Sequence, residues 1–154
     1  MKTSLEPSNA SLVYGAMAAA AIIFSVIPCD AIAQMKKDGD ISLTGEPARS
    51  SPQADIVLNF LTALRASDLK TMMQLTTTKQ GERLQQEMKK PTPDFQQNTK
   101  EMLGDLPADR KELRGIIKYV QMHKERGLVS FETKRNSWFV TLENVAGTWK
   151  VAGF

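Results

Sequence analysis

The sequence "VAGTWKVAGF", residues 145–154, indicates how this chain folds. Gly147 suits the tight turn of a β-hairpin, and the residues that follow it alternate in polarity. Trp149 and Val151 fall on one face of an extended strand, and Lys150 falls on the other. Because a large indole ring supplies much of the apolar surface of a small core, the stretch predicts a strand that places Trp149 against a helical layer.

Three segments of the same kind precede this strand. They are "GIIKYVQMHKER" (115–126), "GLVSFETKR" (127–135) and "SWFVTLENV" (137–145). In the first segment, simple alternation puts Ile117, Tyr119, Gln121 and His123 on one face and Val120 on the other. Short turns separate the segments, so the sequence predicts an antiparallel meander of about four strands.

Helical spacing dominates the residues before the meander. In "SSPQADIVLNFLTALRASD" (50–68), Ser51 is a candidate N-cap and Pro52 suits the first turn. The apolar stripe consists of Ile56, Val57, Phe60, Leu61 and Leu64. Shorter helices are predicted after Asp68, over 79–90, and after Asp94 as a cap. Helices followed by an antiparallel meander define an α+β fold.

The N-terminal residues resemble an export signal. The run "AMAAAAIIFSVI" (16–27) is too short to span a bilayer comfortably, and Ala31 and Ala33 occupy the positions that a signal peptidase reads. Residues 1–33 are therefore predicted to be a signal peptide, which would remove Cys29, the only cysteine. A retained membrane anchor and lipidation at Cys29 are the alternatives. We expect an exported protein, periplasmic or secreted, with no membrane span after cleavage.

Composition divides the remaining chain into a leader and one domain. Residues 34–52 are polar, contain prolines and glycines and show no apolar period, so they are predicted to be a flexible leader. Residues 53–154 form the predicted domain. Its part from 107 to 154 contains nine Lys/Arg against five Asp/Glu. This mild excess is typical of a solvated surface, and no nucleic-acid-binding motif accompanies it.

Two stretches resemble the NTF2-like (cystatin-like cone) superfamily. They are "VLNFLTALRASDLKTMMQLT" (57–76), similar to the first helix of the family and the break after it, and the closing "GTWKVAGF" (147–154). The resemblance implies a curved antiparallel sheet that wraps the first helix and leaves an open-ended apolar pocket. Members include isomerases, dehydratases, binding domains, secretion-system scaffolds and dimerisation modules, so the resemblance implies no particular chemistry.

Large apolar side chains are the candidates for the lining of such a pocket. The predicted ligand-binding residues are Phe60, Tyr119, Phe131, Trp138 and Trp149. Packing in the core is the alternative interpretation for each of them. The methionines Met72, Met73, Met88, Met102 and Met122 are interpreted as flexible core filling rather than as metal ligands, because their spacing does not recur as a binding run.

The sequence predicts no catalytic residue, no metal site and no cofactor. An isomerase-like pocket needs a carboxylate base and a proton donor that converge, and the strands offer Tyr119, His123, Glu132 and Glu143. Tyr119 and His123 lie four residues apart on one strand, so their side chains are about 13 Å apart. A single histidine does not make a typical zinc site.

Three hypotheses of function agree with these observations. The first is an exported, non-catalytic module that binds a protein partner or a small apolar ligand, with a homodimer through the open face of the sheet as one form. The alternative is a pocket enzyme of the isomerase or dehydratase kind, which requires an acidic side chain and Tyr119 in one cavity. A membrane-anchored scaffold of a secretion system is a third hypothesis and depends on a retained N-terminal segment.

Overall fold

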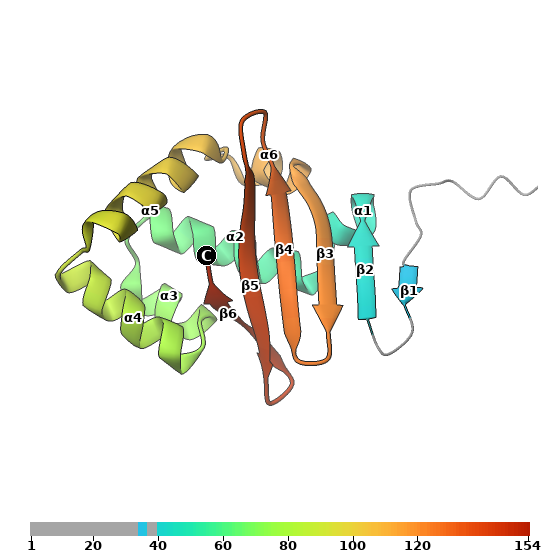
Figure 1. The fold of residues 1–154 in the computed structure, drawn as a ribbon, viewed down its shortest axis with the longest axis horizontal. Coiled ribbons are helices and arrows are strands. Elements are labelled where there is room, and N and C mark those ends of the chain that lie inside the picture. The colour runs from blue at the N-terminus through green and yellow to red at the C-terminus, as the bar shows by residue number, and fades with distance from the viewer. Residues whose placement is uncertain (1–33, 37–39) are drawn as a thin grey trace, which may run out of the picture.

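The computed structural model describes residues 34–36 and 40–154, so the predicted signal peptide over 1–33 lies outside the described residues. The predicted α+β class is confirmed (Figure 1). The helices are α1 (Gly45–Arg49), α2 (Pro52–Arg65), α3 (Leu69–Leu75), α4 (Thr78–Lys89), α5 (Pro93–Asp105) and α6 (Arg110–Gly115). The strands are β1 (Gln34–Lys36), β2 (Asp40–Thr44), β3 (Ile117–His123), β4 (Arg126–Glu132), β5 (Ser137–Val145) and β6 (Thr148–Gly153).

The strands form one open antiparallel sheet in the order β1-β2-β3-β4-β5-β6. The predicted meander corresponds to β3–β6, and β1 and β2 extend it by two strands. The prediction of a flexible leader over 34–52 is wrong for its second half, because β2 pairs with β3 through Leu43 and Val120 and α1 follows directly. Ile41 and Leu43 are the only apolar residues of this strand, and an alternation of this length among polar residues does not predict a strand.

Helix α2 supplies the centre of the core. Its first turn is as predicted, because the Ser51 hydroxyl accepts a hydrogen bond from the amide of Ala54 at 3.1 Å and Pro52 begins the helix. In Figure 1, α2 crosses behind the strands, whereas no helix of the described residues covers the face toward the viewer. The large side chains of α2 that are buried are Val57, Leu58, Phe60, Leu61 and Leu64. These side chains pack against the face of the sheet that α2 crosses.

Helices α3, α4 and α5 lie beside the β5–β6 end of the sheet in Figure 1. Each begins at a side-chain cap, formed by Asp68, Thr77 and Thr92 respectively. The prediction that Asp94 caps α5 is therefore wrong: Asp94 lies in the first turn, and the hydroxyl of Thr92 accepts from the amide of Phe95 at 3.3 Å. Threonine before proline suits an N-cap because Pro93 takes the first helical position.

A register shift in β3 changes which side chains face the core. The pairing with β4 is irregular between Ile117 and Tyr119, which is the signature of a β-bulge. Ile117 and Val120 are both buried as a result, whereas simple alternation assigned Ile117 and Tyr119 to one face. Tyr119 thus belongs to the face of the sheet that the helices leave uncovered.

The C-terminal end of the chain packs against α2, as predicted, but the ring that contacts the helix is that of Phe154 and not that of Trp149. Ala146 and Gly147 have φ values of 51° and 84°, as a tight hairpin turn between β5 and β6 requires. The ring of Phe154 lies 5.1 Å from that of Phe60, between centroids. Trp149 instead lies over β4, with Cζ3 3.1 Å from the position that a Cβ on Gly127 would take.

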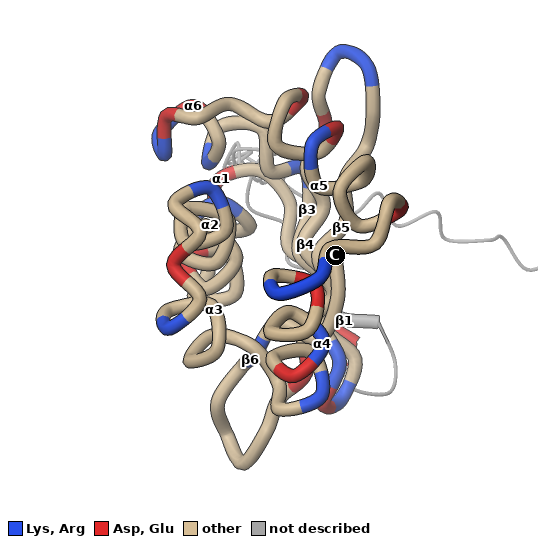
Figure 2. Tube along the Cα trace, turned by 90° about the vertical axis from the view of Figure 1, so that its left-hand side faces the viewer, with Lys and Arg blue, Asp and Glu red and all other residues tan. Residues whose placement is uncertain are grey.

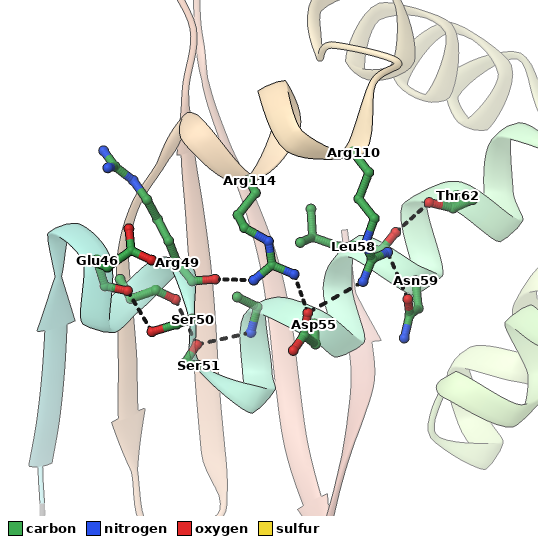
Figure 3. Close-up of polar contacts among 12 residues, drawn as sticks. Glu46, Arg49, Ser50, Ser51, Asp55, Leu58, Asn59, Thr62, Arg110 and Arg114 are labelled. Atoms are coloured by element: carbon green, nitrogen blue, oxygen red, sulfur yellow. Dashed lines mark hydrogen bonds and ion pairs between the residues drawn. The ribbon is translucent and has the colours of Figure 1, made fainter.

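A polar cluster joins the N-terminal end of α2 to α6 (Figure 3). The carboxylate of Asp55 pairs with Arg114 and, at 3.4 Å, with Arg110. Arg110 also donates to the side chain of Asn59 at 2.8 Å, and Arg114 donates to the carbonyl of Arg49. Figure 2 shows basic and acidic positions interspersed along the helices and turns.

Candidate functional site

An aromatic cavity of about 360 Å³ is the best candidate for a binding site. It lies between α4, α5, β5 and the C-terminal residue. The apolar part of its lining is Phe95, Met102, Trp138, Phe139 and Phe154. Small-molecule sites typically have about 300–1,000 Å³ and a mostly apolar lining with a few polar groups. The volume and the aromatic lining of this cavity meet that description.

Helix α5 forms one wall of the aromatic cavity because its residues repeat at helical spacing. Phe95, Asn98, Thr99 and Met102 lie on the side of the helix that faces the cavity. The ring of Phe95 meets that of Phe154 edge to face, with centroids 6.2 Å apart. The contact is one of the favoured aromatic geometries, and it joins the helix to the end of the chain beyond β6.

Polar groups also line the aromatic cavity. They are Gln80 and Arg83 from α4, Thr92 from the α4–α5 connection, and Asp94, Asn98 and Thr99 from α5. The hydroxyl of Thr99 is buried and has no hydrogen-bond partner among the described residues. A buried polar group without a partner costs about 1–3 kcal/mol. A ligand with a polar atom at this point would remove that cost.

Asp105 holds Trp138 at the cavity. The indole Nε1–H of Trp138 donates to Asp105 Oδ2 at 2.7 Å, and the hydroxyl of Thr133 donates to the same oxygen at 2.7 Å. Asn136 donates to it at 3.3 Å. These bonds connect the end of α5 to β5 and to the turn before it, so Asp105 is a positioning residue for the indole ring.

The hydrogen bonds of Asp105 predict a pH-dependent stability. The bond from Trp138, then those from Thr133 and Asn136, lower the pKa of Asp105 below its usual value, and partial desolvation opposes them. In the unfolded chain the pKa is about 3.9. The ionised carboxylate therefore stabilises the fold above that pH, and this contribution is lost as the pH falls through the lower folded pKa. Asp105→Asn should lower the melting temperature near neutral pH but not at strongly acidic pH.

Thermal unfolding of the wild type and Asp105→Asn, followed by circular dichroism between about pH 7 and about pH 2, measures this difference. The two melting temperatures should converge at the acid end. Trp138→Phe removes the hydrogen bond that lowers the pKa of Asp105 most. The difference between its melting temperature and that of the wild type should also narrow toward acidic pH. A gap between wild type and Asp105→Asn that stays constant across the pH range would contradict the role of the carboxylate.

The structure does not bring the five predicted ligand-binding residues together. Trp138 alone lines the aromatic cavity. Phe60 and Phe131 are fully buried in the core, Tyr119 is on the uncovered face of the sheet, and Trp149 lies over Gly127. Of the methionines, Met72 and Met102 are buried, whereas Met73 is exposed.

The groups considered for acid–base chemistry lie apart from the aromatic cavity. Glu132 and Glu143 are exposed, and Glu132 pairs with Lys118 at 2.7 Å. His123 pairs with Asp40 at the end of the sheet. Among residues 34–36 and 40–154, no group of three His, Cys, Asp or Glu side chains is arranged to hold a metal ion.

Two further cavities are larger than the aromatic one. A cavity of about 720 Å³ adjoins the aromatic one and shares Gln80 and Arg83 with it. It is called the basic cavity because Lys79, Arg83 and Lys150 line it. A further cavity of about 480 Å³ lies over the ends of β2, β3 and β4, where Asp40, His123 and Arg126 contribute to its lining. Of the described residues, no Phe, Trp or Tyr lines the last cavity, and its large apolar side chains are Ile41, Met122 and Leu128. It therefore offers a ligand less aromatic surface than the aromatic cavity does.

Comparisons with known proteins identify no relative: no family model, no curated protein and no solved structure matches this chain. Within the described part of the chain, no helix has the length and apolar character needed to cross a membrane.

Proposed function

We propose that this protein is an exported, non-catalytic module of the NTF2-like kind that binds a small, largely apolar ligand in the aromatic cavity. The observation that carries the proposal is the gathering of Phe95, Trp138, Phe139 and Phe154 around one space of about 360 Å³. Burial of apolar ligand surface is worth about 25 cal/mol per Å². Rings from α5, β5 and the C-terminal residue offer such surface on several sides.

The arrangement of elements supports the NTF2-like part of this proposal. An amphipathic helix, α2, lies across an antiparallel sheet, and Phe154, directly after the last strand, packs against Phe60 of this helix. The sheet is open rather than closed. The aromatic cavity lies at the helical end of this layer, where α4 and α5 meet β5.

Ligand binding is tested by filling the cavity. Asn98 is an exposed residue of the cavity lining, so Asn98→Trp should occupy the space with little effect on the core and reduce the binding of an apolar probe such as 1-decanol at least tenfold. Gln96→Trp is the matched control, because Gln96 is exposed on the same helix and lines none of the described cavities. Isothermal titration calorimetry measures the affinity.

Two results would contradict the proposal. One is the absence of 1-decanol binding by the wild type together with the absence of any co-purified small molecule in native mass spectrometry. The other is an equal loss of affinity in Asn98→Trp and Gln96→Trp. Sequencing of the mature N-terminus tests the export part, since cleavage after Ala33 is expected and retention of the N-terminal segment would support a membrane-anchored scaffold.

The pocket-enzyme alternative receives less support from the geometry. It requires Tyr119 and an acidic side chain in one cavity, but Tyr119 belongs to the uncovered sheet face and Glu132 and Glu143 are exposed. Asp94 is the carboxylate that lines the aromatic cavity. No tyrosine or histidine accompanies it there among the described residues, so a second group for proton transfer is lacking in this lining.

A homodimer through the uncovered face of the sheet is also less favoured. The exposed side chains of its central strands are mainly polar or charged, including Gln121, His123, Arg126, Thr141 and Glu143. Stable dimer interfaces are typically depleted in charged residues at their centre. The side chains of this face therefore favour contact with solvent over a stable apolar interface.

A further inference from the structure

We infer that the ligand of the aromatic cavity is an amphipathic carboxylate, whose apolar end lies among the aromatic rings and whose carboxylate lies at Gln80 and Arg83 of α4. The inference rests on the proposed function and adds the chemical class of the ligand. It follows from the way two cavities of different character meet at these two side chains.

Gln80 and Arg83 line both the aromatic cavity and the basic cavity. They are three residues apart on α4, and side chains at this spacing lie on the same side of a helix. A ligand that extends from the aromatic rings toward the basic cavity would pass these two groups. They thus mark the junction between an apolar environment and a polar one.

Gln80 places an amide donor at this junction. The residue is only 6% exposed, and its side chain lines both cavities. A carboxamide Nε2–H group donates hydrogen bonds. A ligand oxygen at the junction would accept from the Gln80 Nε2–H, and this favours a head group with acceptor atoms.

Arg83 favours a head group with negative charge. Its guanidinium forms none of the ion pairs found among the described residues. A guanidinium matches the two oxygens of a carboxylate with two parallel N–H donors. The pair of an amide donor and a guanidinium outside these ion pairs therefore suits a carboxylate better than a hydroxyl or an ammonium group.

The charged side chains of the basic cavity also favour a negatively charged head group. Lys79, Arg83 and Lys150 line it against one carboxylate, Glu143. The N-terminal end of α4 contributes to the same lining through Thr77 and Thr78, and the partial positive charge of a helix N-terminus adds to the attraction for an anion.

Asp94 opposes a negative ligand and makes the inference testable in both directions. It lines the aromatic cavity from the first turn of α5, together with Arg83. If a carboxylate binds near Arg83, removing the charge of Asp94 should strengthen binding, and removing the charge of Arg83 should weaken it. A neutral ligand with the same tail should respond to neither change.

The experiment compares three probes that share one tail: decanoate, 1-decanol and decyltrimethylammonium. Isothermal titration calorimetry of the purified chain measures each affinity in the wild type, Arg83→Gln and Asp94→Asn. Lys89→Gln is the matched control, since Lys89 ends the same helix and lines none of the described cavities. We expect decanoate to bind tightest, Arg83→Gln to weaken it about tenfold, Asp94→Asn to strengthen it, and Lys89→Gln to leave it unchanged.

The outcomes separate this inference from the proposed function. Equal binding of the three probes, or a loss for decanoate that is the same in Arg83→Gln and Lys89→Gln, overturns the carboxylate inference and leaves a general apolar site. Binding of none of the probes overturns the carboxylate inference, and it overturns the proposed function as well when native mass spectrometry finds no co-purified small molecule. Tighter binding of decyltrimethylammonium than of decanoate would overturn the assigned charge.

Discussion

Replacing Phe60 with alanine is expected to lower the free energy of unfolding by about 3–5 kcal/mol. The side chain is fully buried and its ring packs against that of Phe154, 5.1 Å away. Truncation would remove its apolar contacts and leave a cavity between α2 and the end of β6. Chemical denaturation monitored by tryptophan fluorescence measures the change.

Phe139→Ala is the control for this experiment, because the Phe139 side chain is 46% exposed and its truncation should cost less than about 1 kcal/mol. A different result is expected if Phe60 lined a ligand site, which is the role predicted from the sequence. In that case Phe60→Ala would reduce ligand affinity with little loss of stability. That outcome would contradict the assignment of Phe60 to the core.

Replacing Arg65 with methionine is expected to cost about 2–4 kcal/mol, because charged hydrogen bonds to buried or partly buried acceptors are worth about 1.5–3 kcal/mol each and are not additive. The guanidinium donates to three carbonyls at the end of α5, those of Leu103, Leu106 and Pro107, at 3.2, 2.8 and 2.7 Å. Burial lowers the pKa of Arg65 from its usual value, but an arginine remains charged at neutral pH.

Two variants make the Arg65 result specific. Arg65→Lys keeps the charge with a single ammonium group and should lose less stability than Arg65→Met. Arg126→Met removes an arginine that is exposed and makes no side-chain hydrogen bond within the described residues, so it should change stability by less than about 0.5 kcal/mol. Equal losses in Arg65→Met and Arg126→Met, measured by the same denaturation, would contradict the capping role of Arg65.

The connection made by Arg65 also matters for the aromatic cavity. It ties α2 to the C-terminal end of α5, the helix that carries Phe95 and Met102. Asp105, at the end of the same helix, receives the indole N–H of Trp138 from β5. Two polar contacts thus hold the wall of the cavity against both the core and the sheet.

Local patterns in the sequence were sufficient for the central helix and for the meander. Ser51, Pro52 and the stripe through Phe60 predict α2 because each is a local signal. Strand β2 depends on pairing with β3, some 80 residues away, and Ile41 and Leu43 alone are too short an alternation to indicate it. The bulge at Ile117 likewise changes the facing of β3 without a local signal.

The cavity was harder to predict, because a sequence shows which side chains are apolar but not which of them remain at a surface. Phe60 and Phe131 are large aromatic residues like Trp138, yet both are completely buried in the core. The helical spacing of Phe95 and Met102 was a usable signal for one wall. The contribution of Phe154 depends on where β6 ends relative to α2 and α5, which only the tertiary structure provides.

The central claim is that a ligand enters the space beside Trp138, and the indole N–H resonances test it most directly. The chain contains two tryptophans, so a ¹⁵N-labelled sample should give two indole signals, and Trp138→Phe assigns them. Titration with decanoate should shift the signal of Trp138, whose N–H is bound to Asp105 at the cavity, and leave that of Trp149 in place. A shift confined to Trp149, or no shift of either signal at saturating decanoate, would contradict the claim.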